Sequence, residues 1–115
     1  MDRIINAGIS SFGVSSRLFH CPFLQVHPGF SINTIVERTK NLSAARYPSA
    51  SIVRSIDEML ANKDIELVII NTPDITHYEY TRAALMAGKH VIVEKPFVLK
   101  PAHGEELIEI AQKKG

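Results

Sequence analysis

The turn between residues 8 and 17 combines small residues in a way that suits phosphate binding. A G-x-G-x-x-G pattern, in which small residues let the backbone approach a pyrophosphate, fits it in two registers. One register uses Gly8, Ser10 and Gly13, and the other uses Ser11, Gly13 and Ser16. We prefer the second, because it starts the turn after the predicted strand and leaves the anion to backbone N–H groups at a helix start. The alternative is an ordinary Ser/Gly-rich loop that caps a helix.

Two charged neighbours, Glu37 and Arg38, follow the turn along the sequence. Dinucleotide-binding folds place an acidic residue that contacts the ribose about 20 positions after the turn, and Glu37 lies at that distance. A glutamate there accepts hydrogen bonds from the adenosine ribose, which favours NAD. An arginine pairs with a 2′-phosphate or stacks on adenine, which favours NADP. The pair therefore points to NAD or NADP. Its alternative is a solvated charge pair at the end of a strand.

Short apolar runs that alternate with helical patterns would position these residues. Strands are expected at residues 3–9, 31–36, 66–71 and 90–93, with a weaker candidate at 51–53. Such runs suit a parallel sheet covered on both faces. Helix signals lie between them: Ser55 and Glu58 have capping-box spacing, and Gly88 closes a helix from about Thr76. A last helix has Pro101 near its start. The order predicts an α/β fold with a doubly wound parallel sheet, the Rossmann arrangement, with antiparallel α+β as the alternative.

Composition narrows the classes of function. The 115 residues are expected to form one domain, 1–115, with a formal net charge of only +1, which argues against nucleic-acid binding. No apolar run approaches the ~20 residues that span a membrane, and we expect no leader peptide. Cys21 is the single cysteine, which favours a reducing, cytoplasmic setting. With His20 and His27 it forms no recognisable metal set.

The stretch from residue 71 to residue 97 carries the most specific pattern. It contains Thr72-Pro73 with His77, then Ala84-Leu85 and Gly88-Lys89-His90-Val91, and finally Glu94-Lys95-Pro96. These blocks closely resemble the Gfo/Idh/MocA family, the group of glucose–fructose oxidoreductase and inositol dehydrogenase. Residues 16–23 are similar to that family's first turn and helix, so that the resemblance covers essentially the whole chain. Ser11 and Ser16 depart from it, because the family usually has glycine there.

The resemblance implies a site for a nicotinamide dinucleotide. It assigns Lys95 as the catalytic residue that positions the substrate and transfers a proton; a solvent lysine before a proline is the alternative. Asn71, Thr72 and Pro73 are expected to pass beneath the nicotinamide and its ribose. His77 would lie beside the same crevice, unless it is an ordinary histidine at a helix start. The expected cofactor contacts are Ser11, Phe12, Gly13, Ser16, Glu37, Arg38, Asn71, Thr72, Pro73, His77, Glu94, Lys95 and Pro96.

The resemblance also implies a second α/β domain, which holds the substrate and the acid–base histidine and aspartate. We expect the chain to be the Rossmann domain without that partner, so that a sugar, polyol or related small-molecule substrate is reached only through the missing part. The face left uncovered is expected to favour a homo-oligomer. The alternative function is a non-catalytic module that senses dinucleotide or mediates interactions.

Overall fold

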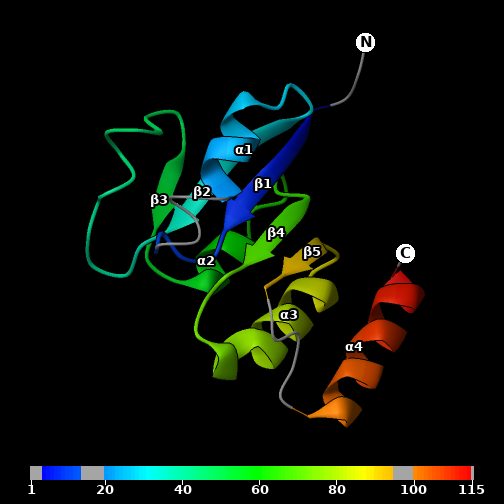
Figure 1. The fold of residues 1–115 in the computed structure, drawn as a ribbon. Coiled ribbons are helices and arrows are strands. Elements are labelled where there is room, and N and C mark those ends of the chain that lie inside the picture. Colours follow the sequence, from blue (N-terminus) through cyan, green and yellow to red (C-terminus); the bar gives the residue numbers. More distant parts are fainter. Residues whose placement is uncertain (1–3, 14–19, 95–99, 115) are drawn as a thin grey trace.

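Five parallel strands form one sheet at the centre of the molecule (Figure 1). The computed structural model describes residues 4–13, 20–94 and 100–114. The strands are β1 (Ile5–Ile9), β2 (Phe30–Val36), β3 (Ser51–Val53), β4 (Leu67–Ile70) and β5 (His90–Val93). Their order in the sheet is β3-β2-β1-β4-β5, so that the direction of winding reverses between β1 and β4. The predicted doubly wound parallel sheet is confirmed, and the antiparallel alternative is wrong.

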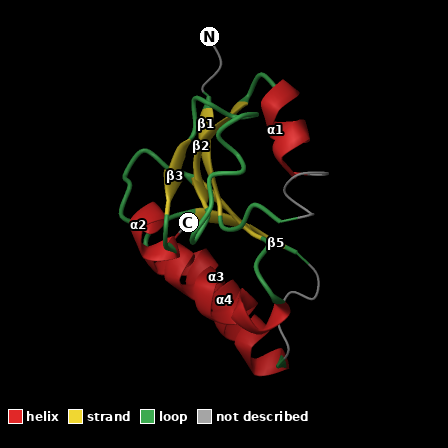
Figure 2. Cartoon of the chain, turned by 90° about the vertical axis from the view of Figure 1, so that its left-hand side faces the viewer, coloured by secondary structure: helices red, strands yellow, loops and turns green. Residues whose placement is uncertain are grey.

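Helices cover the two faces of this sheet (Figure 2). Helix α1 (Cys21–Val26) lies on one face, and α2 (Ile56–Leu60) and α3 (His77–Met86) lie on the other. A 3-10 turn, η2 (Asp74–Thr76), leads into α3, and α4 (Pro101–Lys114) packs along α3. No helix in the described part of the chain is long and apolar enough to cross a membrane.

The central strands are apolar on both sides because each side has a helix to pack against. In β4 all four residues are buried, and their side chains alternate between two clusters. Leu67 belongs to the cluster that contains Leu24 of α1. Val68 belongs to the cluster that contains Met59 of α2. The apolar run of β4 therefore corresponds to a strand that is buried on both faces, whereas β5, at the edge of the sheet, leaves Ile92 48% exposed.

Local signals set most of the element boundaries. The Ser55 hydroxyl accepts a hydrogen bond of 3.2 Å from the Glu58 amide, as the capping spacing predicts. Gly88 follows α3 with φ of +81°, a conformation that glycine adopts without steric cost. Strands β3 and β5 have the predicted bounds, whereas β2 begins one residue earlier than expected. Strand β4 is shorter than predicted, because Glu66 and Asn71 lie outside it.

The last helix is held by polar contacts as well as by Leu107, which is buried. The Tyr78 hydroxyl on α3 donates to the carboxylate of Glu106 on α4, at 2.6 Å to the nearer oxygen. The Tyr78 ring also stacks on His103, with ring centroids 3.7 Å apart. These contacts hold α4 against α3.

Candidate functional site

Each of the five strands is followed directly by a polar or charged residue. Because the strands are parallel, their carboxyl ends meet at one edge of the sheet. The fold therefore gathers five residues that are far apart in the sequence. They are Ser10 after β1, Glu37 after β2, Arg54 after β3, Asn71 after β4 and Glu94 after β5.

A cleft of about 730 Å³ opens at this edge. Its size is typical of a small-molecule or cofactor site. It runs from the end of β1 past the ends of β2 and β3 to the first turns of α3. The residues in its wall that the sequence predicts as cofactor contacts are Ser11, Phe12, Gly13, Glu37, Arg38, Thr72 and Pro73.

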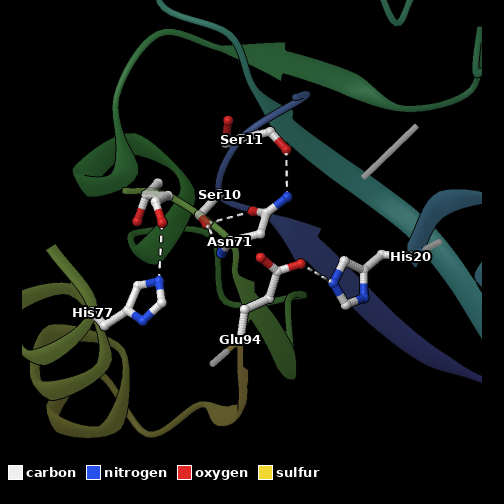
Figure 3. A network of polar contacts seen from close by, with 7 residues as sticks. Ser10, Ser11, His20, Asn71, His77 and Glu94 are labelled. Atoms are coloured by element: carbon white, nitrogen blue, oxygen red, sulfur yellow. Dashed lines mark hydrogen bonds and ion pairs between the residues drawn. The ribbon is translucent and has the colours of Figure 1, made fainter. Parts of the chain in front are cut away.

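Asn71 joins the turn after β1 to the end of β4 (Figure 3). Its Nδ2 donates to the carbonyl oxygen of Ser11 at 2.8 Å, and its Oδ1 accepts from the Ser10 hydroxyl at 2.9 Å. The Ser10 hydroxyl oxygen also accepts from the backbone N–H of Asn71 at 3.0 Å. Asn71 is absent from the cleft wall and holds the backbone of the turn from behind. It is thus placed to orient the turn, and its contact with a cofactor stays a prediction.

Gly8 and Gly13 have different surroundings. Gly8 lies inside β1, and a Cβ there would come within 2.6 Å of the Met59 sulfur. Its glycine is required for close packing of α2 on the sheet. Gly13 lies in the cleft wall, where the nearest atom to an added Cβ is the Ser11 hydroxyl at 3.7 Å. Of the two, only Gly13 leaves open space for a ligand beside the backbone.

Glu37 and Arg38 differ in burial, although they are neighbours. Glu37 is 7% exposed, and its carboxylate accepts hydrogen bonds from the Leu42 amide at 2.9 Å and the Ser43 amide at 3.0 Å. The Ser43 hydroxyl donates a third bond of 2.6 Å. Burial by itself raises the pKa of Glu37, but these bonds and the charge of Arg54 bring that pKa below its ordinary value. Glu37 is therefore a buried anion that shapes the loop after β2, and the alternative of a solvated pair is wrong for it.

Basic side chains occupy the same end of the cleft. Arg38 and Lys40 are exposed, and both lie in the cleft wall. Arg54 comes from the end of β3 and donates to the backbone carbonyl oxygens of Glu37 at 3.0 Å and Lys40 at 2.5 Å. Those two bonds come from its Nη1, and its Nη2 donates to the side-chain oxygen of Asn41 at 2.6 Å. The guanidinium thus holds the loop that carries Arg38 and Lys40.

The segment after β4 lines the opposite side of the cleft. Thr72 and Pro73 are in its wall, whereas His77 is 1% exposed and lies outside it. The His77 Nε2 is 2.9 Å from the Thr72 carbonyl oxygen. The contact of His77 with a cofactor stays a prediction. The side chain is buried beneath the segment and holds Thr72, because it belongs to the first turn of α3 and faces the sheet.

Glu94 pairs with a histidine from the other end of the chain. Its Oε1 lies 2.7 Å from Nε2 of His20, the residue before α1, and both side chains are partly exposed (Figure 3). Glu94 is not part of the cleft wall described above. Ser16, Lys95 and Pro96, which the sequence also predicts as site residues, lie outside the described residues. Within the described ranges, no three His, Cys, Asp or Glu side chains gather as metal ligands.

Some residues of the site escaped the sequence prediction. Arg54 follows the short strand β3, and the weak strand signal at residues 51–53 would have pointed to it. Ser10 belongs to the register that we set aside. Thr76 and Tyr80 enter the cleft wall from η2 and α3, and their spacing in the sequence carries no separate signal.

Comparison with known proteins agrees with this geometry. The model of an oxidoreductase family with an NAD-binding Rossmann fold, Gfo/Idh/MocA, matches residues 5–115. The scyllo-inositol 2-dehydrogenase (NADP(+)) of Bacillus subtilis is 38% identical over 111 residues, which are 96% of this chain and 31% of that protein. The dTDP-3,4-didehydro-2,6-dideoxy-alpha-D-glucose 3-reductase of Streptomyces violaceoruber is 34% identical over 115 residues, 98% of this chain and 33% of that protein.

Among solved structures, a Bacteroides fragilis protein provisionally described as an oxidoreductase superposes with a TM-score of 0.97 and 53% identity. The superposition covers 98% of this chain and 35% of that one. The chain thus spans about a third of the length of the proteins it matches. The family match extends over nearly all of the chain, and the cleft lies at the strand edge where Rossmann folds bind their ligands. The chain therefore belongs to the Gfo/Idh/MocA oxidoreductases and is their NAD(P)-binding Rossmann domain.

Proposed function

We propose that this domain binds NADP(H) and serves an oxidoreductase that acts on a hydroxyl or carbonyl carbon of a sugar, polyol or related small molecule. The observation that carries the proposal is the cleft at the carboxyl ends of β1, β2 and β4, whose wall combines an open glycine turn with exposed basic side chains. The inositol dehydrogenase and sugar reductase among the relatives support the substrate class.

The residues present fit a dinucleotide. Backbone N–H groups of the turn at Ser11, Phe12 and Gly13 would bind the pyrophosphate, because Gly13 leaves room for close approach. Asn71 keeps that turn in place through its bond to the Ser11 carbonyl oxygen. Thr72 and Pro73 would lie under the nicotinamide half. When bound, the cofactor accepts or supplies a hydride at C4 of its nicotinamide ring.

The choice of NADP over NAD follows from Glu37 and Arg38. The Glu37 carboxylate already accepts three hydrogen bonds from Leu42 and Ser43 and is buried, so that little of it is left for a ribose hydroxyl. Arg38 and Lys40 are exposed in the same wall and would pair with a 2′-phosphate. The relative from Bacillus subtilis is named as an NADP(+) enzyme, which supports the choice.

Lys95 is proposed as the catalytic residue. It follows Glu94 in the sequence, and Glu94 lies directly after β5, at the edge of the sheet where the strands end. A lysine ammonium there would hold the substrate oxygen and exchange a proton with it as the C–H bond is made or broken. The remaining substrate contacts would come from the part of the relatives that this chain does not span, because the substrate must be held against the nicotinamide for hydride transfer.

The cofactor assignment is tested by calorimetric titration of the folded chain with NADPH and NADH. We expect NADPH to bind at least about tenfold more tightly, a preference worth about 1.4 kcal/mol. Arg38→Ala should remove most of that preference while NADH binding stays unchanged. Arg46→Ala is the matched control, since Arg46 is exposed and outside the cleft wall. Binding of neither cofactor would overturn the proposal, and a preference for NADH would overturn its NADP part.

The catalytic assignment needs the full-length protein. Turnover is measured with NADP⁺ and a panel of scyllo-inositol, myo-inositol and glucose, and with NADPH and the corresponding ketones. Lys95→Ala should lower kcat by about 10²- to 10⁴-fold with the NADPH affinity unchanged. Retained turnover in Lys95→Ala would show that the lysine is not catalytic.

A second candidate function is a non-catalytic module that senses dinucleotide or mediates interactions. It is favoured by Ser11 and Ser16, which stand where the family usually has glycine. The titration with NADPH and the turnover measurement on the full-length protein together distinguish the two functions. A sensor binds NADPH but turns over no member of the panel, whereas the oxidoreductase does both.

A further inference from the structure

A hydrogen bond between His20 and Glu94 connects the start of α1 to the carboxyl end of β5. His20 follows the segment that continues from the phosphate turn, and Glu94 precedes Lys95. Their side chains meet at 2.7 Å, although 74 positions separate them in the sequence. An ionised carboxylate can only accept, so Nε2 of His20 donates. A bond of this length to an ionised acceptor belongs to the stronger class of hydrogen bond.

Both partners are anchored by their neighbours. The backbone N–H of Glu94 donates to the Ile70 carbonyl oxygen at 3.1 Å, which extends the ladder between β4 and β5 by one residue. Next to His20, Cys21 is 0% exposed and belongs to the core cluster under α1. The pair therefore joins two fixed points and is not a contact between mobile surface side chains.

The His20–Glu94 pair lies apart from the contacts that hold the loop after β2. In the sheet order β5 is separated from β2 by β1 and β4, so that the ends of the cleft are held by different contacts. The adenine end depends on Glu37, Ser43 and Arg54. Figure 3 shows Glu94, directly after β5, directed towards His20, with Asn71 beside Glu94. None of the contacts that hold the loop after β2 involves either residue of the pair.

We propose that His20 is a positioning residue for the nicotinamide end of the cleft and acts through Glu94. The bond holds His20, at the start of α1, against Glu94, which directly follows β5 and precedes Lys95 in the sequence. This inference rests on the proposed binding of NADP(H). It assigns a function to His20, which is not in the wall of the described cleft. His20 also belongs to no group of metal ligands among the described residues.

The test compares two probes on the full-length protein, NADPH and adenosine 2′,5′-bisphosphate. The second has the adenosine 2′-phosphate half of the cofactor but no nicotinamide. His20→Ala should weaken NADPH binding by about tenfold and leave the affinity for adenosine 2′,5′-bisphosphate unchanged. His20→Gln keeps an N–H donor and should recover most of the loss. His90→Ala is the control, because His90 is an exposed histidine at the opposite end of β5.

A double-mutant cycle locates the effect in the pair. Glu94→Gln with His20→Ala should bind NADPH no more weakly than the worse single variant, since both remove the same bond. Wild-type affinity for NADPH in a folded His20→Ala protein overturns the inference. Equal weakening of both probes also overturns it, because the pair would then support the fold as a whole. If the wild type binds neither probe, it is the proposed function that fails.

Discussion

The side-chain amide of Asn71 lies 2.8 Å from the carbonyl oxygen of Ser11 and donates a hydrogen bond to it. The residue that directly follows β4 thus fixes the backbone of the turn that follows β1. These two strands are neighbours in the sheet, and the winding direction reverses between them. The bond therefore orients the proposed phosphate turn from a rigid element.

Asn71→Ala should separate binding from stability. It removes the bonds to Ser11 and Ser10, so that we expect about tenfold weaker NADPH binding and a loss of about 1–2 kcal/mol in unfolding free energy. Asn33→Ala is the matched control, since the Asn33 side chain also takes part in two hydrogen bonds, as acceptor in both, but lies outside the cleft wall. It should lose similar stability and bind NADPH normally. Calorimetric titration and urea unfolding measure both effects, and unchanged NADPH affinity in Asn71→Ala would contradict this role.

The two glycines should respond differently to alanine. Gly8→Ala places a methyl group against the sulfur of Met59, which is fully buried, and should destabilise the domain by about 1–3 kcal/mol. The Gly8→Ala/Met59→Ala double variant should lose less stability than the sum of the two single changes. Gly13→Ala meets open space and should keep the stability of the wild type while NADPH binding weakens. Thermal unfolding with titration decides this, and a stability loss confined to Gly13→Ala would reverse the two assignments.

Glu37 should make the unfolding free energy of the domain depend on pH in the acidic range. Its pKa in the folded domain is lower than its ordinary value of 4.5, so that its charged form stabilises the fold above about pH 4.5. That contribution is lost as the pH falls through the lower, folded pKa. Glu37→Gln should therefore be less stable than the wild type near neutral pH, and the difference should shrink in acid.

Ser43→Ala provides the companion measurement to Glu37→Gln. It removes the 2.6 Å hydroxyl bond to the Glu37 carboxylate and should reduce the same pH dependence without abolishing it, because the two amide bonds remain. Urea unfolding of both variants between about pH 3 and pH 7 provides the comparison. A gap between wild type and Glu37→Gln that widens in acid would be incompatible with the lowered pKa.

Cys21 should be inert in the folded protein. The side chain is 0% exposed, and burial raises the pKa of its thiol to about 11. A disulfide reagent such as DTNB reacts with thiolate, so at about pH 8 we expect no labelling until denaturant is added. Ser49→Cys places a thiol at an exposed position and should be labelled at once in the folded state. Rapid labelling of Cys21 in the native wild type would contradict its burial.

The sequence by itself was sufficient to determine the fold class and most element positions. Apolar runs, the Ser55 cap and the glycine after α3 act over a few residues, so that their signals survive without tertiary contacts. The Glu94-Lys95-Pro96 block was specific enough to identify the family, which the match over residues 5–115 confirms. The serine-rich turn was a much weaker indication of a dinucleotide site.

Only the tertiary structure decided what the site residues do. Glu37 turns inward because Ser43 offers it hydrogen bonds, and His77 is buried because α3 packs against the sheet. His20 meets Glu94 across 74 positions of sequence, and Arg54 reaches the loop after β2 from another strand. These roles depend on strand order and side-chain direction, which arise when distant segments pack together and leave no periodic signal in the sequence. The residue types therefore pointed to the cofactor, whereas the packing determined which of them lie in the cleft wall and which hold the others in place.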